Sequence, residues 1–194
     1  MSSKNLVEKR EHVSDELLDD SLKVFADTSK ELEVLATNIL NWIKYQHQDR
    51  KLMKESFNLH QTTDQVIRLV APLYNPKNIT IQNNIHPDME IHQFLEPIKI
   101  IIYNLILNAI YFTPVNGLIQ INCLKENNSY KLTITDNGIG MTKEQSKNIL
   151  NRDFIVSSQN VDEKRGSGLG YLIIRDLLKI LEADILITDR KSVV

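Results

Sequence analysis

The first fifty residues carry one continuous helical pattern of apolar positions. From Ser14 to Arg50 the chain has no glycine or proline, and a seam of mostly apolar positions recurs in alternating steps of four and three. The seam consists of Leu18, Leu22, Phe25, Ser29, Leu32, Ala36, Ile39 and Ile43. This spacing is typical of a coiled coil. One amphipathic helix cannot bury its own stripe, so the pattern predicts a long helix that packs on a partner.

After Arg50 the pattern becomes mixed, which places a domain boundary near residues 51–57 and divides the chain into segments 1–50 and 51–194. Helical spacing predicts helices from Asn58 or Thr63 to Leu73 and at Leu95–Phe112, Thr142–Leu150 and Leu169–Leu181. Alternation predicts strands around Ile79–Ile85, Met89–Gln93, Leu118–Leu124, Tyr130–Ile134 and Ile185–Thr188. The second of these follows the first across a turn at residues 86–88, and a hairpin turn joins the third and fourth.

Residues 151–165 have no periodicity and predict a mobile loop. Helices and strands therefore alternate irregularly, with hairpins between strands. This order indicates an α+β fold with an antiparallel or mixed sheet rather than a doubly wound α/β fold.

Composition and charge narrow the function classes. The 194 residues include 23 Lys and Arg against 25 Asp and Glu, a net charge of −2, which argues against a protein that mainly binds nucleic acid. A single cysteine excludes a disulfide framework and a Cys-rich zinc site. The apolar stretch Ile98–Phe112 is interrupted by Lys99, Asn104 and Asn108, and residues 1–12 lack the apolar core of a signal peptide. We therefore expect a soluble cytoplasmic chain without membrane contact of its own.

Five of the six glycines lie in two short segments. Gly166, Gly168 and Gly170 occur in RGSGLGYLII, and Gly138 and Gly140 occur in the sequence DNGIG. Glycines at the start of a helix let the backbone approach a ligand, and free N–H groups there suit phosphate. The rival interpretation, a dinucleotide fingerprint, requires a different glycine spacing directly after a strand.

Asp136 follows a strand that alternates Leu132 and Ile134, so its carboxylate is expected on the inward, apolar face. A buried acid needs a partner, such as a donor on a ligand. The alternative is an acid that caps its own turn, because Asp-Asn-Gly is also strong turn chemistry.

Asn104 and Asn108 lie four residues apart in IIYNLILNAIYFTP, on one face of an apolar helix. Asparagine is unfavourable there unless its amide is used. Either both amides cap neighbouring backbone, or they point into a site where a carboxamide oxygen ligates a hard cation such as Mg²⁺.

Three segments, taken in order, carry a resemblance. Asn104–Thr113, Asp136–Gly140 and Gly166–Gly170 resemble the N, G1 and G2 boxes of the GHKL, or Bergerat-fold, ATP-binding domain that sensor histidine kinases share with gyrase, Hsp90 and MutL. NLILNAIYFTP is similar to the histidine kinase form of the N box, and ATNILNWIKYQ resembles the second helix of the kinase dimerisation hairpin. The resemblance covers residues 32–188. It implies a two-layer α/β sandwich with a mixed sheet, preceded by part of that helical hairpin.

The resemblance also implies roles for particular residues. Asp136 accepts from the adenine amino group, Asn108 holds Mg²⁺ and Asn104 lies near the phosphates. Phe154 matches the aromatic residue of a lid formed by residues 151–165. The expected ATP-binding residues are Asn104, Asn108, Tyr111, Phe112, Asp136, Gly138, Gly140, Gly166, Ser167, Gly168, Leu169 and Gly170.

Position 104 separates the branches of this superfamily. Members that hydrolyse ATP carry a glutamate there, and an asparagine has no basicity to activate water. The sequence therefore favours a kinase over an ATPase. Two positions depart from the kinase pattern: Tyr111 stands where the family has a basic residue, and His12, the one histidine upstream of the expected helix, lacks the flanking pattern of an acceptor box.

These features predict the ATP-binding region of a sensor histidine kinase, shortened at its C-terminus, from a parent protein that is membrane-anchored or cytoplasmic. Its reaction is expected to be transfer of the ATP γ-phosphoryl group to a histidine, for relay to an aspartate in a response regulator receiver domain. We expect the chain to bind ATP and Mg²⁺, to form a homodimer through the N-terminal helix and to autophosphorylate poorly. The alternatives are an inactive scaffold of the same fold and an ATPase.

Overall fold

The computed structural model describes Leu22 and residues 53–127, 129–142 and 169–188. The chain divides into two units, Met1–Gln46 and His47–Val194, and apart from Leu22 the description covers the second. The predicted N-terminal helix, the boundary between residues 50 and 51, residues 143–150 of the predicted short helix and the loop at 151–165 lie outside the described residues.

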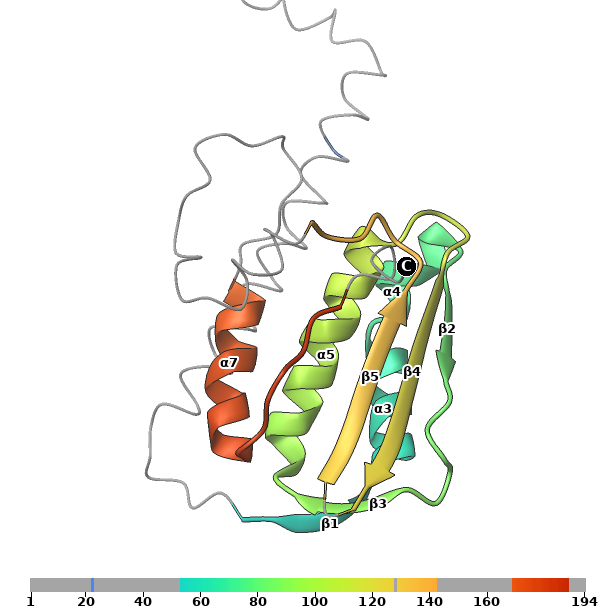
Figure 1. The fold of residues 1–194 in the computed structure, drawn as a ribbon. Coiled ribbons are helices and arrows are strands. Elements are labelled where there is room, and N and C mark those ends of the chain that lie inside the picture. The colour runs from blue at the N-terminus through green and yellow to red at the C-terminus, as the bar shows by residue number, and fades with distance from the viewer. Residues whose placement is uncertain (1–21, 23–52, 128, 143–168, 189–194) are drawn as a thin grey trace, which may run out of the picture. The chain divides into compact units, whose positions relative to one another are not determined.

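The larger of the two sheets in the described chain is mixed. Its strands are β2 (Thr80–Asn83), β4 (Leu118–Glu126) and β5 (Ser129–Asp136), in the order β2-β4-β5 (Figure 1). β2 runs parallel to β4, and β4 pairs with β5 as the predicted antiparallel hairpin. The α+β fold with a mixed sheet is confirmed.

A second, two-stranded sheet was not expected from the sequence. β1 (Glu55–Asn58) pairs antiparallel with β3 (Glu90–Gln93). β1 lies in the segment that the pattern assigns to a domain boundary. The strand at Met89–Gln93 does form, but it pairs with β1 and not with the strand before the turn. Pairing partners are set by long-range contacts that a local pattern does not contain.

The central helix is α5 (Leu95–Phe112), with the bounds predicted from its apolar spacing. Ile102 and Ile106 of α5 are fully buried in one core cluster with Ile119 and Ile121 of β4. By length and composition alone α5 is long and apolar enough to cross a membrane. Its burial against the sheet marks it as the core helix of this domain.

Helix α3 (Leu59–Leu69) begins at the first of the two predicted starts, because Asn58 caps it. Asn58 Oδ1 accepts from the Gln61 backbone amide at 2.9 Å. The helix stops at Leu69, and α4 (Ala71–Tyr74) and a 3₁₀ turn, η1 (Asn75–Lys77), follow it. Pro72 stands in the first turn of α4, where its missing N–H is tolerated.

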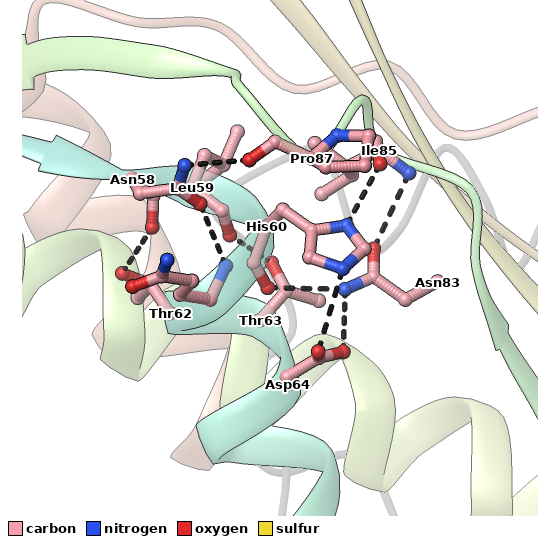
Figure 2. Close-up of polar contacts among 10 residues, drawn as sticks. Asn58, Leu59, His60, Thr62, Thr63, Asp64, Asn83, Ile85 and Pro87 are labelled. Carbon is pink, nitrogen blue, oxygen red and sulfur yellow. Dashed lines mark hydrogen bonds and ion pairs between the residues drawn. The ribbon is translucent and has the colours of Figure 1, made fainter.

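Polar contacts join the start of α3 to the last residue of β2 and to the chain just after it (Figure 2). His60 Nδ1 donates to the Ile85 carbonyl at 2.8 Å, since a carbonyl oxygen can only accept. Asn83 Nδ2 donates to Asp64 Oδ1 at 2.7 Å and to the His60 carbonyl at 3.1 Å. These bonds replace contacts with water for groups that packing has partly buried.

Helix α7 (Leu169–Leu181) packs on α5 and buries Ile173, Ile174 and Leu177. The predicted strand at Ile185–Thr188 was wrong, because residues 183–188 are neither helix nor strand. Ile185 and Ile187 are half-buried while Leu186 is 78% exposed. The alternation therefore reports one buried face, and a buried face does not require a hydrogen-bonded ladder.

Candidate functional site

The C-terminal end of α5 meets the turn after β5. The Ile139 amide donates to the Phe112 carbonyl at 3.4 Å. Gly138 packs so closely that a Cβ there would lie 2.5 Å from the Phe112 carbonyl oxygen and 2.6 Å from Asp136 Oδ1. No side chain fits at position 138 without moving the backbone. Two of the predicted segments, far apart in sequence, are thus joined at one end of α5.

Asp136 is the last residue of β5 and is half-buried. It alternates with Leu132 and Ile134, which pack against the core cluster, so the expected inward face is correct. Oδ1 accepts from the Gly138 amide at 2.9 Å, which is the bond that the turn-capping interpretation requires. A carboxylate has about four acceptor sites. Capping its own turn therefore leaves Asp136 able to accept from a ligand as well.

Asn104 is 3% exposed, and its Nδ2 donates to the Ile100 carbonyl at 2.8 Å. The backbone-capping interpretation is therefore correct for this amide group. The other side of the carboxamide faces α7: a Cβ on Gly170 would lie 2.8 Å from Asn104 Oδ1. The glycine-rich segment and the asparagine helix, predicted separately, are in direct contact.

Asn108, one turn further along α5, is exposed, unlike Asn104. Its carboxamide is accessible to a ligand. Tyr111 is 40% exposed, and its ring meets the Phe112 ring edge-on, with centroids 5.0 Å apart and planes at 81°. The exposed side of α5 near its C-terminal end thus presents one amide and one aromatic side chain.

Other predicted residues lie at the margin of the description or beyond it. Gly140 is exposed at the end of the turn, and Leu169 is the first residue of α7. The predicted residues outside the described chain are His12, Phe154, Gly166, Ser167 and Gly168. Within the described part, no group of three or more His, Cys, Asp or Glu side chains could hold a metal. A cation at this site would need oxygen ligands from elsewhere, such as phosphates and water.

Two titratable groups in the described chain have a shifted pKa. Burial raises the pKa of the Tyr171 phenol, next to Gly170, although the positive charge of Arg175 lowers it in part. Burial also raises the pKa of the Cys123 thiol on β4. Both groups are therefore neutral near pH 7.

Sequence reasoning missed Lys77. Its Nζ donates to three carbonyls at the end of α5, those of Ile110 at 2.8 Å, Tyr111 at 3.2 Å and Thr113 at 3.3 Å. One signal was available: α5 has no basic residue in its last turn and no glycine directly after it, so its end needed a cap from elsewhere. The pattern could not say which residue supplies it.

Comparisons with known proteins found a family match and solved structures of similar fold. Residues 95–193 match the family described as "Histidine kinase-, DNA gyrase B-, and HSP90-like ATPase". The autoinducer 2 sensor kinase/phosphatase LuxQ of Vibrio vulnificus is 26% identical over 170 residues, which cover 84% of this chain and 20% of LuxQ. The chain spans about a fifth of the length of the first such curated relatives.

Histidine kinases are among the solved structures with a similar fold. The catalytic domain of histidine kinase ThkA matches with a TM-score of 0.56 and 24% identity, over 66% of this chain and 81% of that one. ThkA in complex with the response regulator protein TrrA matches with a TM-score of 0.55 and 21% identity, over 75% of this chain and 43% of that one.

Proposed function

The chain belongs to the family of histidine kinase-, DNA gyrase B- and HSP90-like ATPases, and from that premise we propose that it is the ATP-binding kinase domain of a sensor histidine kinase. Its ligand is ATP with Mg²⁺. Its reaction is transfer of the γ-phosphoryl group to a histidine, for relay to an aspartate of a response regulator receiver domain. The solved complex of ThkA with a response regulator supports that class of partner.

One observation carries the proposal: two segments that are distant in the sequence, the turn after β5 and the start of α7, both contact α5, which is the third predicted segment. The β5 turn meets the Phe112 carbonyl, Gly170 meets Asn104, and Asn108 lies on α5 between those two contacts. A ligand that contacts all three segments must lie along the C-terminal half of α5. ATP with Mg²⁺ offers a chemically distinct group to each of these segments: the adenine base, the phosphates and the metal ion.

Each part of the ATP molecule has a matching group. We assign the adenine amino group to the Asp136 carboxylate, which is half-buried and retains acceptor capacity beyond its bond to Gly138. The phosphates belong toward the start of α7, where N–H groups at the helix N-terminus favour anions.

Asn108 fits the metal that this family implies. Its carboxamide is exposed, and Mg²⁺ commonly takes one or two protein ligands together with substrate phosphates and water. The described residues offer no all-protein metal cluster, in keeping with a cation held mainly by the nucleotide. When bound, Mg²⁺ supplies neutralising charge for the phosphates.

Asn104 favours phosphoryl transfer over hydrolysis. Its carboxamide is buried, bonded to the Ile100 carbonyl and has no basicity, so it cannot activate water. A histidine acceptor is itself the nucleophile, through an imidazole nitrogen. The protein then contributes mainly positioning and electrostatic stabilisation. We propose that water is excluded as an acceptor for want of a base.

Calorimetric titration with a non-hydrolysable ATP analogue and Mg²⁺ tests the site. In Asp136→Asn, the side-chain oxygen can still accept from the Gly138 amide, so the turn is kept while the charge is lost. A hydrogen bond to a charged group contributes about 1.5–3 kcal/mol, so affinity should fall about tenfold or more. Asp88→Asn is the matched control, because its carboxylate is 92% exposed on the loop before β3. No binding by the wild type would favour the scaffold alternative.

Transfer itself is tested with γ-labelled ATP and Mg²⁺. We expect no stoichiometric label on this chain alone, because His12 lacks the flanking pattern of an acceptor. Steady release of labelled phosphate would favour the ATPase alternative. Label on His12 at a stoichiometric level would show that the chain carries its own acceptor.

A further inference from the structure

The C-terminal end of α5 is capped by a residue from a distant segment. A helix leaves its last carbonyls without partners of its own. Here the Thr113 amide satisfies the Ala109 carbonyl, and the Ile139 amide satisfies that of Phe112. The carbonyls of Ile110, Tyr111 and Thr113 all accept from Lys77 Nζ. One ammonium group, with three donors, thus completes the end of the helix.

We propose that Lys77 is a positioning residue for the ATP site. It acts by holding the last turn of α5 in position. The turn that contains Asp136 is attached to that end of the helix through the bond from the Ile139 amide to the Phe112 carbonyl. The proposal rests on the proposed function, because ATP binding is the property that it explains.

Lysine suits this position electrostatically. The carbonyl end of a helix carries partial negative charge, and a cation within the last turn is stabilising. Lys77 is half-buried and its Nζ bond to the Ile110 carbonyl is partly buried, which strengthens the attraction relative to a fully exposed pair. With a neutral side chain at position 77, the three carbonyls would lose the ammonium donor and would have to bond water instead.

The backbone around Lys77 holds the chain that follows α5. The Asn116 amide donates to the Lys77 carbonyl at 2.9 Å, and Asn78 Nδ2 donates to Asn116 Oδ1 at 2.6 Å. The Lys77 side chain therefore donates hydrogen bonds to the end of α5, while its backbone carbonyl accepts one from the loop that leads to β4. The side chain and backbone together thus bond Ile110, Tyr111, Thr113 and Asn116.

The Phe112 carbonyl connects the end of α5 to the turn that contains Asp136. It lies between the carbonyls of Tyr111 and Thr113, which Lys77 holds, and it accepts from the Ile139 amide. Gly138 packs directly on the same carbonyl. If the last turn of α5 frays, the Asp136 turn loses its support, although none of the three Lys77 Nζ hydrogen bonds reaches Asp136 or Asn108.

Lys77→Met tests this role, because methionine keeps an apolar side chain of similar length and removes the ammonium. Lys99→Met is the control for charge: Lys99 lies near the other end of α5, 3.7 Å from Glu96. Asn83→Ala is the control for stability, because it breaks the bonds between α3 and the end of β2 (Figure 2), and none of the described side-chain hydrogen bonds of Asn83 involves α5. Affinity for the ATP analogue with Mg²⁺ is measured well below each melting temperature.

We expect Lys77→Met to bind about tenfold more weakly, Lys77→Arg to retain part of the affinity, and both controls to bind like the wild type. Amide exchange should quicken at Thr113 and Ile139 in Lys77→Met but not in Asn83→Ala. If Lys77→Met does not fold, the same exchange measurement on Lys77→Arg decides. Wild-type affinity and exchange in the Lys77 variants would overturn the positioning role alone. Absence of binding by the wild type would overturn the proposed function, and this role with it.

Discussion

Replacing Gly170 with alanine should destabilise the protein, although alanine is the better helix former. Gly170 stands in the first turn of α7, and the added Cβ would lie 2.8 Å from Asn104 Oδ1. Carbon and oxygen atoms do not pack at that distance, so one of the two residues must move. Asn104 cannot easily yield, because it is 3% exposed and its amide is bonded to the Ile100 carbonyl.

Two effects of opposite sign decide the magnitude. Overpacking a well-packed interior costs about 1–3 kcal/mol. Replacing a helical glycine with alanine gains up to about 1 kcal/mol, and less near the end of a helix. We therefore expect Gly170→Ala to lower the free energy of unfolding by about 1–2 kcal/mol.

A double-mutant cycle with Asn104→Ala isolates the contact. In the Asn104→Ala background the oxygen is gone, so Gly170→Ala should become neutral or stabilising by up to about 1 kcal/mol. The coupling energy between the two positions should then be about 2 kcal/mol. Urea denaturation followed by circular dichroism measures all four proteins. If Gly170→Ala stabilises both backgrounds equally, α7 does not pack on Asn104 as described and the convergence of motifs on α5 fails.

Three further expectations follow from buried groups and from the site. Thr113→Val should raise the free energy of unfolding by about 1 kcal/mol, and with it the melting temperature, because Thr113 Oγ1 is buried without a hydrogen-bond partner among the described residues. A clear loss of stability in thermal unfolding would show that the hydroxyl is used. Burial raises the pKa of the Cys123 thiol from its ordinary value of 9.0. The folded state therefore disfavours the thiolate. The contribution of the neutral thiol to stability is complete below pH 9.0 and is lost as the pH rises through the folded pKa. The thiol should also react much more slowly with a disulfide reagent in native buffer than in urea. Tyr111→Lys should tighten binding of the ATP analogue several-fold by restoring a cation near the phosphates, and an unchanged affinity would remove Tyr111 from the site.

Sequence pattern alone located the elements whose character is local. The apolar spacing of Leu95–Phe112 gave both ends of α5, because the helix repeat ends where Pro114 removes a donor. Asn58 marked the start of α3 through its own side chain. The order of the asparagine helix, the Asp136 turn and the glycine-rich segment indicated one ligand before any contact between them was known.

The tertiary structure decided which segments meet. No local rule pairs β1 with β3, assigns Lys77 to the carbonyls of α5, or sets Gly170 against Asn104, because each contact joins residues more than thirty positions apart. Alternation also failed at Ile185–Thr188, where one buried face formed without a strand. A pattern of burial records which side of the chain leaves water. The partner that covers that side is chosen by packing and hydrogen bonding across the whole domain.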